Sequence, residues 1–194
     1  MTIHEILQEM TFEEKVLLLT GAGRMSTYGI ERLGIPPKKM ADGPHGVRTD
    51  MEENCTSFPN LCSVGATWDV DLTYELGEAL AEECIEREIS MLLAPGINIK
   101  RHILCGRNFE YFSEDPYLSG KFAAVITKGV QKNRGCFVTL KHFCCNNQED
   151  NRNKTNANVS ERALREIYLR GFEIAVRESK PGAVMTSYNK VNGT

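Results

Sequence analysis

Four clusters of polar residues in this chain each follow a short apolar run, and this recurrence limits the possible fold more than any other feature. The clusters are ADGPHGVR (41–48), CGRNFEYFSEDP (105–116), LKHFCCNNQE (140–149) and SYNKVNG (187–193). In a barrel of parallel strands, the strands and outer helices supply stability, and residues at the carboxyl ends of the strands supply chemistry. The recurrence therefore predicts one pocket shared by several strand ends.

Three apolar runs without polar alternation are typical of strands buried on both faces, at 91–95, 136–140 and 183–187. Helical patterns lie between them, and such alternation predicts a parallel sheet. We expect the α/β class and a (β/α)8 TIM-barrel type. A complete barrel takes about 250 residues, so residues 1–194 are expected to form the N-terminal part of one barrel domain, an incomplete barrel of about half its strands.

Local signals predict where four helices begin. Thr11 and Glu14 form a capping-box pattern, which predicts a helix flanking the barrel and ending at Gly21. Leucines and Cys84 at every fourth position predict a helix over 69–88 with an apolar stripe facing a sheet. Asp115 and Pro116 are typical of an N-cap and first helical residue. The helix that they begin is expected to run to Gly135.

The last predicted helix begins at Ser160, and its charged residues are expected to form a solvated face. Three pairs are expected four residues apart: Glu161–Arg165, Glu166–Arg170 and Glu173–Arg177. The stretches 43–67 and 143–159 are predicted to be long loops at the strand ends, and Trp68 is expected in the core.

Composition narrows the class of partner. The chain has 194 residues, a formal net charge of −3 and 41% hydrophobic residues, without an apolar run near the ~20 residues of a membrane helix. The charge favours a neutral ligand over nucleic acid or a membrane surface. Seven cysteines without a CxxC pair favour reduced thiols, and no secretion signal is visible. We therefore expect a cytoplasmic protein.

Each candidate site residue has an ordinary structural interpretation beside the functional one. Asp42 precedes a glycine, as turn aspartates do, and Arg107 is near enough to Glu110, Glu114 and Asp115 for a salt-bridge cluster. Lys141 and His142 follow an apolar run directly, so their polar groups need partners near the strand end. Gln148, Glu149 and Arg152 could satisfy them. Tyr188 could be a core tyrosine.

No metal or cofactor is expected. The four histidines show no HxH or HExxH spacing, and a zinc site requires three or four converging ligands. Gly21 and Gly23 follow a helix and lack the third glycine of a dinucleotide-binding loop.

Taken together, the motifs resemble glycoside hydrolase family 3, and more narrowly its intracellular bacterial β-glucosidase branch. The resemblance is carried by five ordered segments: ADGPHGVR (41–48), GRNFEYFSEDP (106–116), LKHFCCNNQE (140–149), ERALREIYLRGFEIAV (161–176) and VMTSYNKVNG (184–193). It covers nearly the whole chain. A branch of the family that cleaves N-acetylglucosaminides has a Gly- and His-rich loop after its Lys-His pair. The loop here begins Phe143-Cys144-Cys145, so the chain does not resemble that branch.

The resemblance implies that the strand ends bind a terminal glucosyl unit of a β-glucoside or oligosaccharide. Asp42 would accept hydrogen bonds from sugar hydroxyls, and Arg107, Lys141 and His142 would donate to them. Tyr188 would lie near the nucleophile, and Met185 and Arg152 are further candidates for the same pocket.

The resemblance also implies that the nucleophile, an Asp in a Ser-Asp-Trp-like motif, and the Glu acid/base fall beyond Thr194. Retaining hydrolysis requires two carboxyl groups about 5 to 5.5 Å apart. We therefore expect the 194-residue chain by itself to be inactive, with self-association or a complementing chain covering open sheet edges. The alternatives are a non-catalytic sugar-binding or partner-binding domain, or a relative that acts on β-xylosides.

Overall fold

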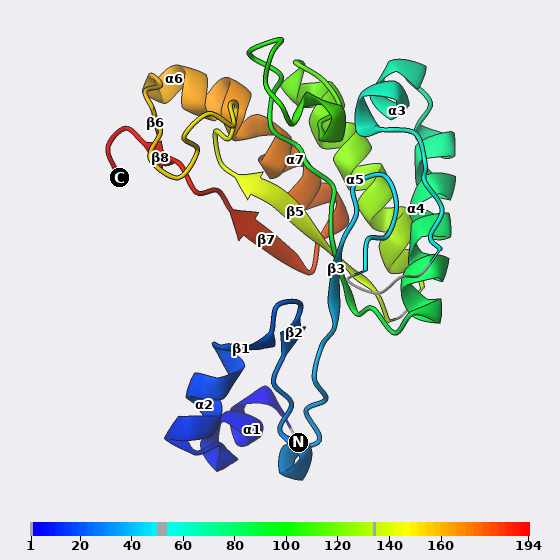
Figure 1. The fold of residues 1–194 in the computed structure, drawn as a ribbon, viewed down its shortest axis with the longest axis vertical. Helices are drawn as coiled ribbons and strands as arrows, with labels where there is room; N and C mark the ends of the chain where they lie inside the picture. The colour runs from blue at the N-terminus through cyan, green and yellow to red at the C-terminus, as the bar shows by residue number, and fades with distance from the viewer. Residues whose placement is uncertain (1, 50–53, 134) are drawn as a thin grey trace.

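The computed structural model describes residues 2–49, 54–133 and 135–194. Its centre is a parallel sheet of four strands in the order β3-β4-β5-β7, so that these strands are neighbours in chain order (Figure 1). The parallel sheet predicted from the sequence is confirmed. The strands are β3 (Met40–Asp42), β4 (Met91–Leu93), β5 (Phe137–Phe143) and β7 (Ala183–Thr186).

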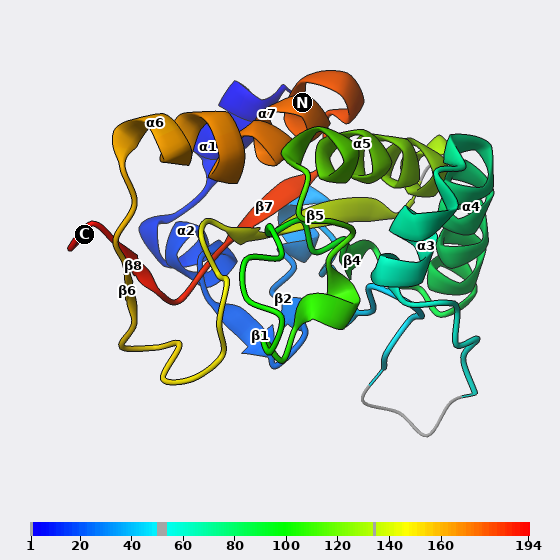
Figure 2. The ribbon, with the colours of Figure 1, turned by 90° about the horizontal axis from the view of Figure 1, so that it is seen from above.

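One layer of helices covers one face of this sheet. The layer consists of α4 (Val70–Glu86), α5 (Pro116–Lys132) and α7 (Arg170–Ser179), with α5 between the other two (Figure 2). Strand, helix and neighbouring parallel strand therefore follow one another, as in the first half of a (β/α)8 barrel. The core lies between the two layers and includes Leu80, Phe122, Ile126, Leu92 and Leu140, each at most 4% exposed.

The predicted start of α5 is confirmed. The Asp115 carboxylate accepts hydrogen bonds from the backbone N–H groups of Tyr117 and Leu118, and Pro116 is the first helical residue. The start of α4 is also as predicted, with Asp69 as its N-cap. Its buried stripe is shifted, however: Leu72 is 50% exposed, and Thr73 and Gly77 face inward.

The shift arises because α4 packs against α5 as well as the sheet. The two helices cross where Gly77 and Gly129 meet, and a β-carbon on Gly129 would lie 2.3 Å from the carbonyl oxygen of Tyr74. A side chain at this crossing would therefore force the helices apart.

The helix predicted to flank the barrel lies elsewhere. The capping box of Thr11 and Glu14 begins α2 (Phe12–Leu18) as predicted, but α2 has no buried residue, and Gly21 lies in a strand. With α1 (Ile3–Glu9), β1 (Gly21–Gly23), β2 (Ser26–Thr27) and η1 (Glu31–Leu33), it forms a lobe at the lower end of Figure 1, away from the helical layer. The prediction that this helix flanks the barrel and ends at Gly21 is therefore wrong.

The last predicted helix is interrupted by a π-turn. Ser160 caps α6 (Glu161–Ala163), then residues Leu164–Tyr168 form the π-helix η3, and α7 follows. Because the π-turn changes the spacing along the surface, Arg170 pairs with Glu173 instead of Glu166. The predicted pairs Glu161–Arg165 and Glu173–Arg177 form.

Three further expectations are wrong. The stretch 43–67 is not all loop, because its end forms α3 (Leu61–Thr67). Trp68 follows α3 with φ of 57° and is 77% exposed, so it is outside the core. Strand β7 is one of the two outer strands of the sheet, and Val184 is 43% exposed, so β7 is not buried on both faces.

The remaining elements are short. Residues 108–110 form the 3-10 helix η2 (Asn108–Glu110), and β6 (Asn156–Ala157) pairs with β8 (Lys190–Val191). Buried Cys84 and Cys136 lie in the core as expected of small apolar side chains. No helix among the described residues combines the length and apolarity needed to cross a bilayer.

Candidate functional site

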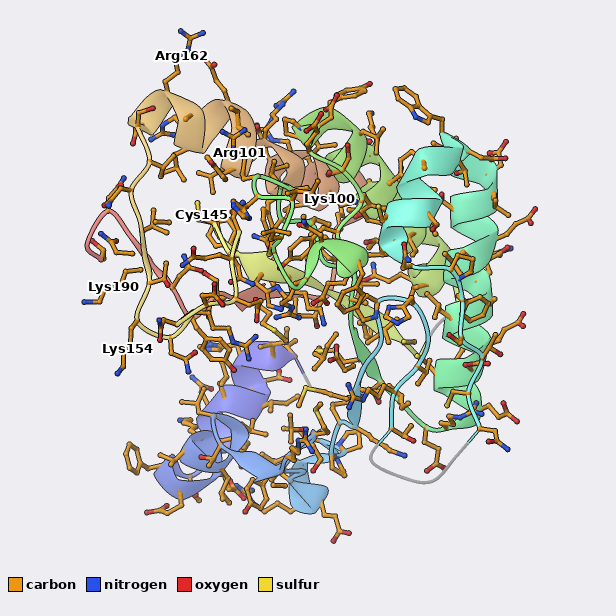
Figure 3. All side chains as sticks on the ribbon, turned by 45° about the horizontal axis from the view of Figure 1, so that its top comes forward. Lys100, Arg101, Cys145, Lys154, Arg162 and Lys190 are labelled. Atoms are coloured by element: carbon orange, nitrogen blue, oxygen red, sulfur yellow. The ribbon has the colours of Figure 1, made fainter. Side chains whose placement is uncertain are left out.

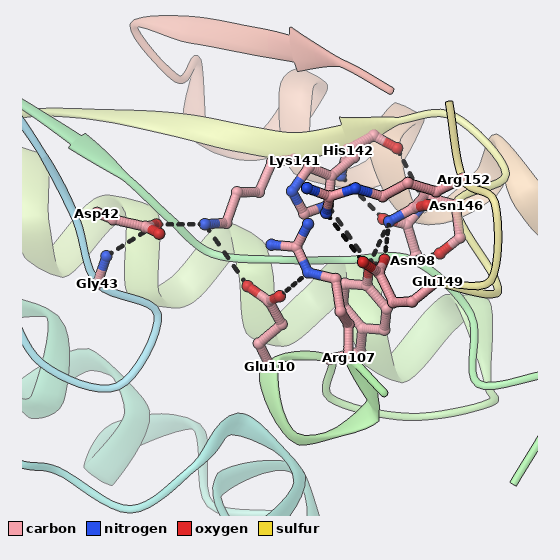
Figure 4. Close-up of polar contacts among 11 residues, drawn as sticks. Asp42, Gly43, Asn98, Arg107, Glu110, Lys141, His142, Asn146, Glu149 and Arg152 are labelled. Carbon is pink, nitrogen blue, oxygen red and sulfur yellow. Dashed lines mark hydrogen bonds and ion pairs between the residues drawn. The ribbon is translucent and has the colours of Figure 1, made fainter. Parts of the chain in front are cut away.

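The strand ends bring the predicted polar residues together at one rim of the sheet. Asp42 is the last residue of β3, and Lys141 and His142 lie near the end of β5. Arg107 directly precedes η2, in the segment that follows β4. These segments converge because parallel strands end at the same edge of a sheet, and Figure 4 shows the resulting cluster.

Lys141 is the centre of the cluster. Its side chain is 2% exposed, and Nζ lies 2.5 Å from Oδ1 of Asp42 and 3.5 Å from Oε2 of Glu110. Arg107 Nε donates to Oε1 of Glu110. The Glu110 carboxylate therefore joins the two cations that the sequence singled out.

The carboxylate of Asp42 remains ionised in this setting. Burial opposes its charge, but the Lys141 ammonium and the hydrogen bond from it outweigh burial, so the pKa of Asp42 lies below its ordinary value. Asp42 keeps an acceptor facing solvent, because its side chain is 37% exposed.

A tight loop orients Asp42. The backbone N–H of Gly43 donates to Oδ1 of Asp42, and the N–H of Arg48 donates to the Asp42 carbonyl at 2.7 Å. Gly43 has a φ of 150°, and a β-carbon there would lie 2.1 Å from the carbonyl oxygen of Gly46. The turn interpretation of Asp42 is therefore confirmed, and the turn leaves its carboxylate at the rim.

His142 is held by groups from two other segments. The Asn98 side chain accepts from the His142 N–H and donates to its carbonyl, both at 2.9 Å. Nδ1 of the ring lies 3.4 Å from the hydroxyl of Tyr111. Burial, followed by the positive charges of Arg107 and Lys141, lowers the pKa of His142 to about 3. The imidazole is therefore neutral at physiological pH.

A second ion pair extends the cluster towards β7. Arg152 donates to Glu149 at 2.9 Å, and its guanidinium carbon lies 5.1 Å from the centre of the Tyr188 ring. Tyr188 itself is 69% exposed, so it is not a core tyrosine. Met185 lies on β7 between Val184 and Thr186, which line an outer groove, so Met185 faces the inner side.

The cluster adjoins a cavity of about 370 Å³, a size within the ~300 to 1,000 Å³ range of small-molecule sites. Asp42, Arg107 and Arg152 line it; Lys141 and His142 are not among its lining residues but contact the same cluster (Figure 4). Three charged lining residues were not among the predicted site residues: Arg48, Glu110 and Glu149. Arg48 ends the segment ADGPHGVR, so its motif could have indicated it. The sequence offered Glu110 and Glu149 only as partners of nearby polar residues, and the structure places both at the cavity.

A larger cavity, about 980 Å³, lies near the amino ends of the strands, between the segments 22–40 and 85–90. Barrels carry stability and not chemistry at that end, and the predicted site residues do not line it. The rim cluster is therefore the candidate site.

The charges of the cluster balance. Three cations, Lys141, Arg107 and Arg152, pair with three carboxylates, Asp42, Glu110 and Glu149. Arg48 is a fourth cation at the cavity, so the site has at most one unbalanced positive charge. A site with nearly balanced charge and many hydrogen-bonding groups suits a neutral polar ligand. Within the described residues, no group of three or more His, Cys, Asp or Glu side chains is placed to hold a metal ion.

Outside the cluster, charged side chains extend from the molecule. Arg162 on α6, and Lys154 and Lys190 near β6 and β8, point outward in Figure 3. As exposed cations outside the cluster, Lys154 and Arg162 are suitable control positions for substitutions of Lys141 and Arg152.

Comparisons with known proteins agree with this fold. Residues 13–194 match the family described as Glycosyl hydrolase family 3 N terminal domain. The chain is 48% identical to thermostable beta-glucosidase B of Acetivibrio thermocellus, over 98% of this chain and 26% of that protein. It is 43% identical to an exo-alpha-(1->6)-L-arabinopyranosidase of Bifidobacterium longum, over 96% and 26%.

A solved structure shares the fold. Beta-glucosidase 3B from Thermotoga neapolitana, solved in complex with glucose, superposes with a TM-score of 0.92 at 47% identity, over 99% of this chain and 30% of that one. The partial barrel predicted from the sequence is thus confirmed. The chain spans about a quarter of the length of the curated relatives it matches.

Proposed function

The chain belongs to glycosyl hydrolase family 3, and from this premise we propose that it forms the sugar-binding part of a retaining β-glucosidase. The substrate is a terminal β-glucosyl residue of a β-glucoside or oligosaccharide. Asp42, Arg107, Lys141, His142 and Arg152 bind its hydroxyls, and Tyr188 and Met185 bound the same site on the β7 side.

One observation carries this proposal: the Lys141 ammonium, almost fully buried, bridges Asp42 and Glu110 at the strand ends. A buried cation is expensive unless it is paired and hydrogen-bonded. The site holds it beside an ionised acceptor and the fork of Arg107, which is the set of donors and acceptors that adjacent hydroxyls require. Glucose in a structural relative supports the same ligand class.

We further propose that the nucleophile and the acid/base are not among these 194 residues. The support is that each carboxylate of the cluster has a cation of its own: Asp42 has Lys141, Glu110 has Arg107, and Glu149 has Arg152. An acid must hold a proton, and despite burial Lys141 keeps the pKa of Asp42 below its ordinary value. The side chains of Glu110 and Glu149 are already engaged by their arginines.

The test is a chimera in which this chain replaces the matching quarter of the Acetivibrio enzyme. We expect the chimera to hydrolyse an aryl β-glucoside and the isolated chain to be inactive. Turnover by the isolated chain would overturn the assignment of the two missing carboxyl groups. An inactive but folded chimera would overturn the proposed β-glucosidase activity.

A pentopyranoside is the second candidate substrate, because one relative is an arabinopyranosidase by name. A pentopyranose lacks the exocyclic hydroxymethyl group of glucose. The same chimera, assayed with aryl β-glucoside, β-xyloside and α-L-arabinopyranoside, decides between them by the ratio of their kcat/KM values.

A binding role without catalysis is tested by titration calorimetry of the isolated chain with glucose. Binding that Lys141→Met abolishes and Lys154→Met leaves unchanged would show a preformed sugar site. Absence of binding in the isolated chain, together with an active chimera, would exclude this alternative.

Self-association remains a prediction for the isolated chain. Strands β3 and β7 are the two outer strands of the parallel sheet, and such edges pair readily with other strands. Size-exclusion chromatography giving a monomer across a wide range of concentrations would contradict it. The cytoplasmic location also stays a prediction from the sequence.

A further inference from the structure

Tyr111 lies beneath His142 because a glycine in the sheet makes room for it. Gly96, after β4, bridges in parallel to both Tyr111 and Lys141. A β-carbon on Gly96 would lie 2.9 Å from the Tyr111 ring. The Tyr111 side chain, 0% exposed, therefore passes across Gly96 and brings its hydroxyl to the imidazole of the neighbouring strand.

The Tyr111 hydroxyl has three polar contacts. It donates to the backbone carbonyl of Asn146 at 3.3 Å, and it accepts from the side-chain amide of Asn146 at 3.1 Å. The third contact is Nδ1 of His142, at 3.4 Å. A phenol has one proton and two acceptor positions.

Only one assignment of protons satisfies all three contacts. The Tyr111 proton points to the Asn146 carbonyl, the Asn146 amide occupies one acceptor position, and the other receives a proton from Nδ1 of His142. If Tyr111 instead donated to Nδ1, its oxygen would face the Asn146 carbonyl without a proton between them. Tautomers are assigned from such networks.

We propose that Tyr111 and Asn146 are positioning residues that hold His142 in its Nδ1–H tautomer, so that Nε2 accepts a hydrogen bond from a sugar hydroxyl. This rests on the proposed function and deepens it, because the resemblance implied a donor at His142.

The other cluster residues explain why an acceptor at His142 would help to bind a sugar hydroxyl. Lys141, Arg107 and Arg152 are donors only, and a hydroxyl that accepts from one of them still has a proton to donate. Nε2 is the ring nitrogen that Tyr111 does not contact, and in this tautomer it can accept a hydrogen bond from that hydroxyl. A neutral ring is required for this, and burial beside two cations keeps it neutral.

The experiment reads the tautomer directly, in the 194-residue chain without sugar. Two-bond ¹⁵N–¹H correlation spectra show which imidazole nitrogen carries the proton, and His142→Gln identifies the signal. We expect Nδ1–H in the unsubstituted chain. A spectrum with the proton on Nε2 overturns the proposal without any variant.

Tyr111→Phe tests the cause. Without the phenol oxygen, the Nδ1–H population should fall and a mixture of tautomers should appear. The matched control is Tyr117→Phe, because Tyr117 is 59% exposed on α5 and its loss should leave the spectrum unchanged. An unchanged Nδ1–H signal in Tyr111→Phe would show that Tyr111 does not hold the ring.

Ligand affinity separates this inference from the proposed function. In the chimera, replacing one sugar hydroxyl by fluorine, which accepts but does not donate, should weaken binding roughly 3- to 10-fold at the position facing Nε2. That penalty should be smaller in Tyr111→Phe. Equal penalties at every position in both proteins would overturn the acceptor role. Nδ1–H in the chain, together with a folded chimera that binds and hydrolyses no sugar, would refute the proposed function and leave the tautomer assignment standing.

Discussion

Oδ1 of Asp42 lies 2.5 Å from Nζ of Lys141, a contact between residues 99 positions apart that joins the ends of β3 and β5. Lys141 is among the largest fully buried side chains of the protein. The contact therefore links the candidate site to the stability of the sheet.

Lys141→Met should destabilise the protein by about 1 to 3 kcal/mol, because it leaves the Asp42 carboxylate without its cation and Glu110 with Arg107 alone. Urea denaturation measures this loss. Lys154→Met, at an exposed loop position, should change stability by less than about 0.5 kcal/mol. Equal effects of the two variants would show that the buried pair has no structural role.

Stability should fall on acidification because of His142. Its pKa is about 3 in the folded chain, against about 6.5 when unfolded. Between these values the unfolded state binds a proton that the folded state does not, so stability falls as pH drops from about 6.5 towards 3. Urea denaturation as a function of pH should show this slope, and His142→Gln should reduce it. His4→Gln on exposed α1 should retain the slope.

Gly129→Ala should destabilise the protein although alanine is the better helix former. Its β-carbon would lie 2.3 Å from the Tyr74 carbonyl, and forced overpacking typically costs about 1 to 3 kcal/mol. Gly171→Ala in α7 is the control, since its nearest neighbour would be at 3.4 Å. Thermal unfolding distinguishes them: we expect a lower Tm for Gly129→Ala and an equal or higher Tm for Gly171→Ala.

Trp68→Gly should leave stability unchanged or raise it by up to about 1 kcal/mol, because glycine adopts the left-handed conformation at the end of α3 without strain. A core tryptophan would instead cost about 3 to 5 kcal/mol when truncated. Denaturant unfolding distinguishes the two cases, because a large decrease in the free energy of unfolding is expected only for a core tryptophan.

Arg152→Ala should weaken glucose binding by the chimera, because it removes the cation that contacts both Glu149 and the Tyr188 ring. The control is Arg162→Ala. Arg162 lies on α6 and also forms one ion pair, with Glu166, but that pair is on the exposed surface. Calorimetry should show a loss for Arg152→Ala only. A similar affinity for both variants would place Arg152 outside the sugar site.

The limits of the sequence are clearest around Arg107. Its motif predicted a carboxylate partner, but Glu110, Glu114 and Asp115 were all near enough in the chain to be that partner. The 3-10 turn at 108–110 directs Glu110 inward to Arg107 and Lys141, while Asp115 caps α5. The π-turn before α7 likewise altered a charge pair that regular helical spacing predicts.

The sequence by itself determined the features that depend on near neighbours: the caps at Thr11, Asp115 and Ser160, the apolar strands, and the ordered motifs that identify the family. The tertiary structure decided which carboxylate meets which cation, the exposure of Trp68, and the contact of Tyr111 with His142. These depend on strand register and helix crossings between distant segments, and such geometry is set by packing and not by the order of adjacent residues.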